Sequence, residues 1–301
     1  MILTLCLNPV LQKTIVFSMN LEKNCVNRAK SHLFDVSGKG VNVSRVLTQL
    51  GIPVLHITQI GGDFSNLFKK LCRKDKISLD SVKVKGNIRF CYTIIDVGVT
   101  ELVEEGYRVD PSVEAKVLRK INYQLNNKNI LAMVISGSKA PGFSDNLYPS
   151  IVYKCINKSL PVVADYRGED LINTLEAVKS LKQKAHLLTI KPNAQELCST
   201  FSCNNAKTDI KDCIESIHNK YGCNCVISDG EHPVMVQTSK GFSLFPVIKA
   251  KSTQNTTGCG DAFTAGFASM ISNGETFQKA VEKGIECGFK NALTLRPGSI
   301  F

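Results

Sequence analysis

One short segment of the chain combines residues that could transfer an anionic group. NTTGCGDAF, residues 255–263, places two glycines and a carboxylate, Asp261, directly before an apolar stretch of helical spacing. Gly258, Cys259 and Gly260 would then lie at the N-terminus of a helix that begins near Gly260, where unpaired N–H groups and the helix dipole attract anions. Asp261 could act there as a general base toward an attacking hydroxyl, or it could simply be a partner of the dipole.

A second glycine-flanked segment also opens an expected helix. SGKGVNVSRVL, residues 37–47, contains Gly38, which frees the backbone, Lys39, which supplies a positive charge, and Asn42, which could hold hydroxyl groups. The apolar residues at 43, 46, 47 and 50 have helical spacing, and Gly51 is a typical residue at a helix C-terminus. Taken alone, this segment is also compatible with an ordinary glycine turn before a helix.

Two more loops follow expected strands. In TIKPNAQEL, residues 189–197, Asn193 and Glu196 are three residues apart and share a helix face. Glu196 could bind Mg²⁺ through water, because Mg²⁺ keeps several waters and prefers carboxylates and phosphates. Capping by Asn193 with Glu196 in the first turn is an equally good interpretation. The other loop is SDGEHP, residues 228–233, and ligands of parallel sheets bind beyond the strand ends, so these loops could share one cleft.

The order of the expected elements indicates the fold class. Apolar segments typical of buried strands occur at 130–136, 160–166, 186–190 and 223–228, and amphipathic helical segments occur at 112–125, 146–156, 169–181 and 209–221. Strands that alternate with helices at this spacing predict an α/β fold, in which a mostly parallel sheet is covered by helices on both faces.

Two segments do not follow this alternation. Residues 11–34 and 87–105 show the period of two that is typical of strands with one exposed face. No change of composition and no linker marks a domain boundary beside them. We therefore expect one domain, residues 1–301, in which these two inserted segments form a small separate sheet that acts as a lid.

Composition restricts the partners and the compartment. The chain has 301 residues with 37 Lys and Arg against 26 Asp and Glu, a net charge of +11 that favours anionic partners such as phosphorylated small molecules. Basic motifs interleaved with aromatic residues are absent, so we expect no nucleic-acid partner. The twelve cysteines are scattered without a CxxC pair, which is typical of thiols in a reducing cytosol. Neither a signal peptide nor a membrane span is evident, so we expect a cytoplasmic protein without membrane contact.

The motifs taken in order resemble a known family. LNP (7–9), SGKGVNVSRVL, TEL (100–102), SGS (136–138), KPNAQEL, SDG and TTGCGDAFTAGF resemble the ribokinase-like carbohydrate kinases of the phosphofructokinase B type, in particular the 1-phosphofructokinase and tagatose-6-phosphate kinase branch. The resemblance covers essentially the whole chain. It implies a doubly wound α/β sandwich with a small β-sheet lid, a homodimer formed through the lid, and phosphorylation of a hexose monophosphate by ATP with Mg²⁺.

The resemblance also implies roles for particular residues. Asp261 matches the catalytic base, and Gly258, Cys259 and Gly260 match an anion hole. The ATP-binding positions would be Asn193, Glu196 (with Mg²⁺), Ser228, Gly230 and, near the adenine, Asn291. The substrate-binding positions would be Gln12, Gly38, Lys39, Asn42, Arg89 and Ser138 (both at the substrate's own phosphate), and the lid residue Arg28.

The sequence departs from the family pattern mainly on the sugar side. Gln12 stands where the family has an aspartate that grips sugar hydroxyls, and glutamine keeps hydrogen bonding but has no charge. Ser37 replaces a glycine, and Val103, Glu105 and Pro233 also differ. Two alternatives therefore stay open: a catalytically weak or inactive sugar- or nucleotide-binding relative, and a kinase of an unphosphorylated sugar or nucleoside. Fructose 1-phosphate, tagatose 6-phosphate and fructose 6-phosphate are all compatible with the motifs.

Overall fold

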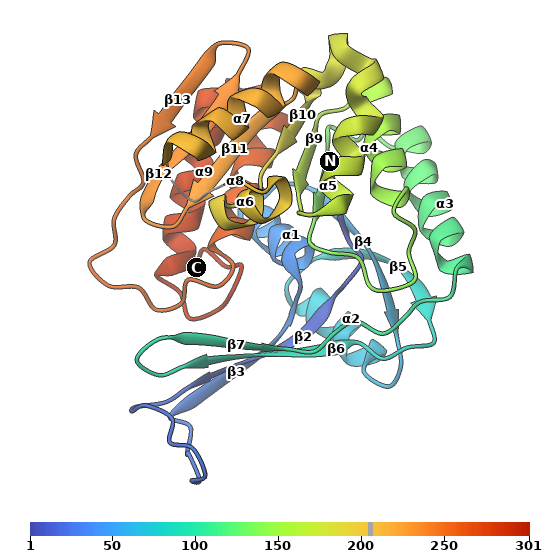
Figure 1. The fold of residues 1–301 in the computed structure, drawn as a ribbon. Coiled ribbons are helices and arrows are strands. Elements are labelled where there is room, and N and C mark those ends of the chain that lie inside the picture. Colours follow the sequence, from blue (N-terminus) through green and yellow to red (C-terminus); the bar gives the residue numbers. More distant parts are fainter. Residues whose placement is uncertain (204–206) are drawn as a thin grey trace.

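A large twisted sheet forms the centre of the protein. The computed structural model describes residues 1–203 and 207–301, and in this part of the chain the main sheet has nine strands in the order β13-β12-β11-β10-β9-β8-β1-β4-β5 (Figure 1). All neighbours from β5 to β11 pair in parallel, and β12 and β13 are antiparallel. The strands are β1 (Ile2–Cys6), β4 (Val54–Gly61), β5 (Ser78–Val84), β8 (Ala132–Ser136), β9 (Val162–Asp165), β10 (Leu188–Ile190), β11 (Asn224–Asp229), β12 (His232–Thr238) and β13 (Gly241–Phe245).

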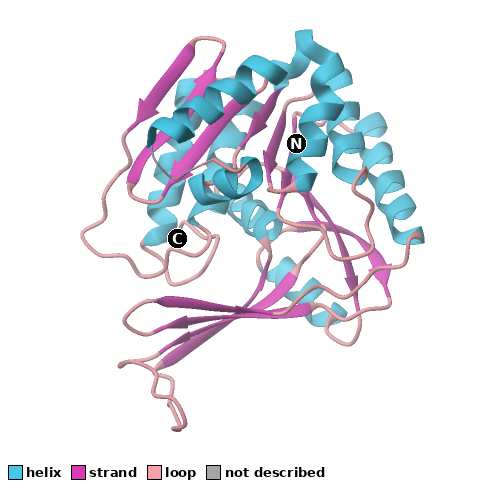
Figure 2. Ribbon diagram, viewed as in Figure 1, coloured by secondary structure: helices cyan, strands magenta, loops and turns pink. Residues whose placement is uncertain are grey.

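Helices cover both faces of this sheet, as the sequence predicts (Figure 2). One face carries α1 (Lys39–Gln49), α8 (Cys259–Ser272) and α9 (Phe277–Ala292), whose apolar side chains form one core cluster with the strands. The other face carries α3 (Ser112–Asn127), α4 (Leu147–Asn157), α5 (Glu169–Val178), α6 (Ala194–Phe201) and α7 (Lys207–Tyr221), which form the larger core cluster. The predicted α/β fold class is confirmed.

One predicted helix is too long at its C-terminus. The sequence predicts a helix over 169–181, but α5 ends at Val178 and the chain continues as a 3-10 helix, Lys179–Leu187. Leu181 within that segment has φ −97° and ψ 36°, which is outside the helical region. The apolar spacing continues through the kink because Leu181 still packs against the core, so periodicity alone does not reveal the break.

The two segments with a period of two come together in a second sheet. It consists of β2 (Val10–Val16), β3 (Ser31–Ser37), β6 (Arg89–Ile95) and β7 (Val99–Val103) in the order β3-β2-β6-β7. Only β2 and β6 are parallel neighbours. Leu11 and Val36 of this sheet pack with Phe68 of α2 (Ser65–Lys74) in a third core cluster.

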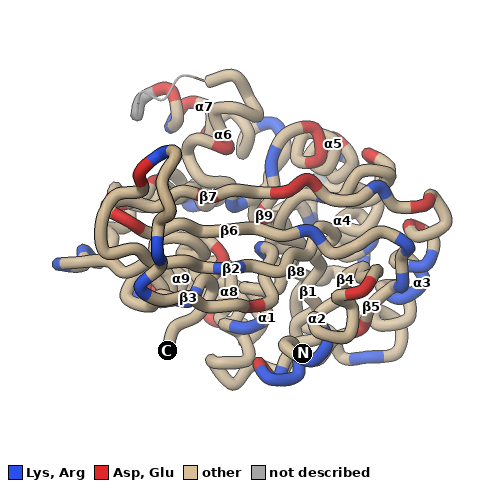
Figure 3. The backbone as a smooth tube through the Cα atoms, turned by 90° about the horizontal axis from the view of Figure 1, so that it is seen from below, with Lys and Arg blue, Asp and Glu red and all other residues tan. Residues whose placement is uncertain are grey.

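The second sheet lies across one end of the main sheet. Seen from below, its strands cross the body of the molecule side by side, and acidic and basic residues are interspersed along the chain on this side (Figure 3). The loop between β2 and β3 projects away from the body as a narrow arm (Figure 1). Within the described residues, no helix has both the length and the apolar character needed to cross a membrane.

Candidate active site

A cavity of about 670 Å³ lies between the carboxyl ends of the main-sheet strands and the second sheet. Ligands of doubly wound sheets bind at this edge, and the volume is in the range of small-molecule sites. Most of the side chains that the motifs single out line it: Gln12, Gly38, Lys39, Asn42, Arg89, Asn193, Glu196, Ser228, Gly230, Gly258, Cys259, Gly260 and Asp261. The tertiary structure therefore collects loops from both ends of the sequence into one pocket.

The N-terminus of α8 forms part of the cavity wall. The helix begins at Cys259, one residue from the predicted start, and its N-cap Gly258 has φ 85°. A Cβ at Gly258 would lie 2.3 Å from the backbone nitrogen of Gly298, so the close approach of two loops requires a glycine here. The first N–H groups of a helix lack partners within the helix, and the dipole is positive at this end; Cys259 N donates to Thr256 O at 3.3 Å, and Gly258, Cys259 and Gly260 all line the pocket. The helix end can therefore bind an anionic group.

Asp261 lies in the first turn of α8 and is only 6% exposed. Its Oδ2 accepts a hydrogen bond of 2.8 Å from Asn42 Nδ2, across 219 residues of sequence. Burial, followed by the negative charge of Asp165, raises the pKa of Asp261 to about 7, although Lys39, Asn42 and Lys191 act in the opposite direction. A carboxyl group with such a pKa can take up and release a proton near neutral pH.

The pKa of Asp165, at the end of β9, is shifted in the opposite direction. Burial opposes its ionisation, but Lys191 Nζ and Lys39 Nζ, at 3.7 and 3.6 Å from Oδ1, hold its pKa below the ordinary value. Ser136 and Thr264 also donate hydrogen bonds to its Oδ2. The environment thus pushes the pKa values of two nearby carboxyl groups apart, which is a pattern typical of acid–base sites.

Lys39 connects the two sides of the pocket. Its Nζ donates to Glu196 Oε1 at 3.0 Å, and the same atom lies near Asp165. Burial disfavours its charge, but Asp165, Glu196 and Asp261 together raise the pKa of Lys39 above its usual value. The ammonium group therefore stays protonated at neutral pH, where it can neutralise a phosphate group.

Asn193 and Glu196 form a complete capping box at the start of α6. Asn193 Oδ1 accepts from Glu196 N at 2.8 Å, and Asn193 N donates to Glu196 Oε2 at 3.1 Å. The capping interpretation is therefore correct, and both side chains also face the pocket. Each carboxylate oxygen of Glu196 already has a protein partner but keeps free lone pairs, so the residue fits a hydrated Mg²⁺ held through water.

Arg89 of β6 lines the side of the pocket that is formed by the second sheet. It donates to Glu104 O at 3.0 Å and to Asn8 O at 3.1 Å, and its buried Nε has no partner among the described residues. Asn8 Nδ2 in turn donates to Ser138 Oγ at 3.2 Å. Ser138 is therefore connected to Arg89 only through Asn8, and it does not line the cavity itself.

Two other residues singled out in the sequence lie outside the cavity. Arg28 is exposed on the arm between β2 and β3. Asn291 is fully buried in α9, where Nδ2 donates to Thr257 O at 3.0 Å and Oδ1 accepts from Ser299 N at 3.0 Å. Asn291 thus braces the loop that precedes α8, while its neighbour Ala292 lines the pocket.

The sequence reasoning missed several side chains of the pocket. Asp165 and Lys191 are each 2% exposed and line it, as do the apolar residues Val247 and Phe289. A signal for Asp165 was present, because an acidic residue that ends a buried apolar strand in a parallel sheet faces the ligand edge. The apolar residues belong to loops and helices whose position the local pattern does not reveal.

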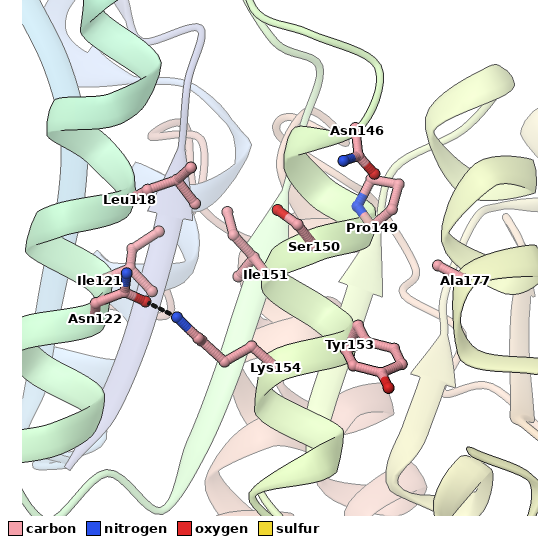
Figure 4. Close-up of a pocket in the computed structure, with 10 residues that line it drawn as sticks. All are labelled: Leu118, Ile121, Asn122, Asn146, Pro149, Ser150, Ile151, Tyr153, Lys154 and Ala177. Carbon is pink, nitrogen blue, oxygen red and sulfur yellow. Dashed lines mark hydrogen bonds between the residues drawn. The ribbon is translucent and has the colours of Figure 1, made fainter. Parts of the chain in front are cut away.

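A second cavity, of about 370 Å³, lies between α3, α4 and the end of α5. Leu118 and Ile121 of α3 face Ile151 of α4 there, and Lys154 donates to Asn122 across the groove (Figure 4). Among the described residues that line it there is no carboxylate. It therefore lacks the acid–base groups that distinguish the larger cavity.

The doubly wound sheet, with a second sheet over its carboxyl end, has the architecture of the ribokinase-like fold. The chain matches the model of the pfkB family carbohydrate kinases over residues 7–295, and it belongs to that family. The protein is accordingly an ATP-dependent carbohydrate kinase, and the family resemblance of the motifs is confirmed.

Solved structures with the same fold cover nearly the whole chain. Phosphofructokinase-2 from Escherichia coli, with potassium, superposes with a TM-score of 0.84 at 20% identity, over 97% of this chain and 93% of that one. A possible 1-phosphofructokinase from Thermotoga maritima gives 0.85 at 23% identity, over 98% and 92%. Ribokinase from Arabidopsis thaliana, complexed with ribose and ATP, gives 0.73 at 14% identity, over 99% and 94%. At these identities the likeness shows the fold alone.

Proposed function

We propose that this kinase transfers the γ-phosphoryl group of ATP to a hydroxyl group of a hexose monophosphate. The observation that carries the proposal is the position of Asp261, a buried carboxyl group with a pKa of about 7 in the first turn of α8. It lines the same cavity as Lys39 and Arg89, which suit two anionic substrates. A base, a helix N-terminus and two cations are the groups that phosphoryl transfer requires.

The proposed mechanism assigns one task to each group. Asp261 orients the sugar hydroxyl and accepts its proton as the oxygen attacks phosphorus. The N–H groups of Gly258, Cys259 and Gly260 form the anion hole that binds the moving phosphoryl group, and Lys39 neutralises part of its charge. The N–H groups belong to the first turn of a helix and Lys39 lines the same cavity, which supports a reaction that needs little reorganisation of these groups.

We assign the ATP side of the cavity to the loops after β10 and β11. Asn193 and Glu196 follow β10, Ser228 lies near the end of β11 and Gly230 follows it. All four line the cavity, which also has apolar residues that suit a nucleobase. Asn291 would act indirectly, by holding the loop before α8. Glu196 would hold Mg²⁺ through water, and the bound ion would add positive charge beside the phosphates.

We assign the sugar side to Gln12, Gly38, Lys39 and Asn42, with the substrate's own phosphate at Arg89. Ser138 contributes to the phosphate site through Asn8, to which it is hydrogen-bonded. The buried Nε of Arg89, which has no partner among the described residues, supports a role in binding an anion.

The second sheet is proposed to act as the lid of a single domain, residues 1–301. Segments 11–34 and 87–105 contribute Gln12, Arg89 and Glu101 to the cavity wall, so movement of this sheet would open and close the site. Closure would exclude water and protect ATP from hydrolysis. Arg28, on the arm of this lid, would approach the substrate only in a closed or dimeric form.

A homodimer through the lid would cover exposed apolar side chains on the second sheet. Leu102, which is 56% exposed, and Val99, which is also exposed, lie on the edge strand β7, and Val97 in the turn before this strand is 82% exposed. An edge strand with apolar residues favours pairing with another chain. We expect Leu102→Lys to shift the protein from dimer to monomer in light scattering, with exposed Leu131→Lys on the other side of the protein as the matched control. A monomeric unsubstituted protein would contradict this.

A specific observation favours a second candidate function. Gln12, which stands where the family has an aspartate, is 4% exposed and donates from Nε2 to Thr93 Oγ1 at 2.6 Å. One of its two N–H donors is therefore occupied, and no carboxylate grips the sugar at this position. A sugar- or nucleotide-binding relative with weak or no turnover is consistent with this change.

The two candidates are distinguished by ADP release with Mg-ATP against a panel of hexose monophosphates and free sugars. Turnover on one phosphorylated hexose, with none on the free sugar, is the expected result. Turnover only on a free sugar or nucleoside would replace the proposed substrate class. Protein that binds ATP but releases no ADP with any acceptor would favour the binding relative.

Arg89→Lys is expected to raise KM for the sugar phosphate by roughly 10- to 100-fold and to leave KM for ATP unchanged. A lysine cannot bind a phosphate in two-point fashion, and loss of a charged hydrogen bond costs about 1.5 to 3 kcal/mol. Steady-state kinetics with each substrate varied would check this. Arg119→Lys, on the exposed face of α3, is the matched control. An unchanged KM for the sugar phosphate would remove Arg89 from the phosphate site.

The pH dependence of the reaction should follow the ionisation of Asp261. The base acts only when it is deprotonated, and burial with the charge of Asp165 raises its pKa to about 7. We therefore expect kcat/KM to rise with pH through an acidic limb near pH 7 and to level off above it. A rate that is already constant between pH 5 and pH 8 would show that Asp261 is not the titrating base.

A further inference from the structure

The side-chain amide of Asn42 is hydrogen-bonded to Asp261. Asn42 belongs to α1 and is 3% exposed, and its Nδ2 donates to Asp261 Oδ2 at 2.8 Å. An ionised carboxylate only accepts hydrogen bonds, so the amide must present its NH₂ group to Asp261. A flipped amide would present its oxygen and would favour the protonated carboxyl group. The orientation of this amide therefore bears on whether Asp261 can act as a base.

The oxygen of the same amide accepts hydrogen bonds from two donors. Arg45 Nη1 donates to Asn42 Oδ1 at 3.0 Å, and Ser37 Oγ donates to the same oxygen at 3.1 Å. A guanidinium group has no acceptor, so the amide atom that faces Arg45 must be the oxygen. The NH₂ group is then forced to face Asp261. The chemistry of Arg45 alone excludes the flipped orientation.

Arg45 is itself held rigidly. It is 1% exposed, and its Nε donates to Asp75 Oδ2 at 2.8 Å. A second guanidinium, that of Arg296, contacts the same Asp75 carboxylate and reaches Asp35 of β3. Arg45 also donates to the carbonyl of Pro297 at 2.9 Å. A buried charge with this many partners keeps one position, which is what orienting a neighbouring amide requires.

We infer that Arg45 and Ser37 are positioning residues, which lock the amide of Asn42 so that it donates to Asp261 and favours the ionised form of the base. The inference rests on the proposed function for the role of Asp261 as base. Arg45 does not line the cavity, and Ser37, which does line it, acts on Asp261 through its hydrogen bond to Asn42. Ser37 ends β3 of the second sheet, so one of the two locks comes from the proposed lid.

Other charged groups also affect the pKa of Asp261, and the test must separate their effect from that of the orientation of the Asn42 amide. Arg45 carries a positive charge, and its removal could raise the pKa of Asp261 without involving Asn42. The titratable groups on the surrounding elements that interact electrostatically with Asp261 are Asp165 at the end of β9, Lys191 after β10, Lys39 of α1, Cys6 of β1 and Cys259 of α8 itself.

The decisive measurement is the pKa of Asp261 by carbon-13 NMR of the aspartate carboxyl groups in the full chain, with the resonance assigned by Asp261→Asn. Asn42→Leu removes the hydrogen bond and should raise this pKa by about 1 to 2 units. Arg45→Met should raise it nearly as much, because the amide can then flip. In the Asn42→Leu background, Arg45→Met should add almost nothing.

Ser37→Ala removes no charge and should raise the pKa by roughly half a unit, while Ser37→Thr, which keeps the hydroxyl group, should restore it. Buried Ser269→Ala, whose hydroxyl group donates to Gly266 O within α8, should change nothing. Arg45→Met leaves Asp75 with Arg296 as its partner but removes a buried charge from this network, and it could fail to fold. In that case the Ser37 variants still decide the question, and Arg45→Lys, whose ammonium group also only donates, should leave the pKa unchanged.

Two results would overturn the inference. One is an equal shift by Arg45→Met with and without Asn42, which would show a direct effect of charge. The other is an unchanged pKa in Ser37→Ala, which removes one of the two donors to Asn42 Oδ1 without removing a charge. The titration needs no turnover, so an enzyme without activity on any sugar would refute the proposed function and leave this test in force.

Discussion

Asp261→Asn is expected to lower kcat by roughly 10²- to 10⁴-fold, with little change in KM for either substrate. The amide has nearly the same shape but cannot accept the proton of the sugar hydroxyl, and general-base catalysis contributes about this much. The binding groups Lys39 and Arg89 are untouched by the change. Initial rates of ADP release under saturating substrates would measure it.

The matched control for this change is Asn255→Asp, which exchanges the same two residue types in the reverse direction. Asn255 belongs to the same segment but does not line the cavity. It should fold less well, because it buries a new charge, but the protein that folds should keep an acidic limb near pH 7. Asp261→Asn enzyme with a kcat close to that of the unchanged protein would show that another group accepts the proton.

The same Asp261→Asn change should alter the pH dependence of stability. The folded-state pKa of Asp261 is about 7, above the value of about 4 for an unfolded aspartate. Any stability from this group is therefore present below about pH 4 and is lost as the pH rises through 7. We expect Asp261→Asn to gain stability relative to the unchanged protein between pH 5 and pH 8. Urea denaturation at both pH values would check it, and a constant difference would contradict it.

Gly258→Ala is expected to have the second-largest effect, and on both stability and activity. Gly258 has φ 85°, and an added Cβ would meet Gly298 N at 2.3 Å and Pro297 C at 3.1 Å. The left-handed conformation costs about 1 kcal/mol for alanine, and displacement of the neighbouring backbone adds about 1 to 3 kcal/mol. Because the displaced loop carries the N–H groups at the start of α8, kcat should fall as well.

Gly274→Ala is the matched control for the glycine substitution. Gly274 follows the other end of α8 with φ 73°, and an added Cβ there would have no atom within 4 Å. Gly274→Ala should lose only the stability that the left-handed backbone conformation costs an alanine, and it should keep full activity. Equal losses of stability in the two variants, by denaturant unfolding, would show that the contact with Gly298 is not what requires glycine at position 258.

Much of the architecture was predictable because its signals are local. The helix start at Cys259 follows from glycines ahead of an apolar stretch. The end of α1 at Gln49 follows from Gly51, two residues further on, which has φ 74°. The capping box of Asn193 and Glu196 lies within four residues. Alternation with a period of two also identified the strands of the second sheet. Each of these depends on interactions within a few turns or one strand.

The partners within the site were not predictable in the same way. The bond between Asn42 and Asp261 joins α1 to α8, and the pairing of Asp165 with Lys191 joins the ends of β9 and β10. Asn291 was expected at the adenine but lies buried beneath the loop before α8. Which loops meet depends on strand order and on the angle at which each helix leaves its strand. No local spacing records either of these.

The sequence by itself therefore determined the class of fold, the motifs and the residue types available for phosphoryl transfer, since periodicity, capping and glycine placement are short-range properties. Only the tertiary structure decided the environment of Asp261. Its pKa depends on burial and on Asp165, 96 residues earlier in the chain (261 − 165). Desolvation and the charge of a distant residue exist only once the chain has folded, because in the unfolded chain water surrounds both carboxyl groups.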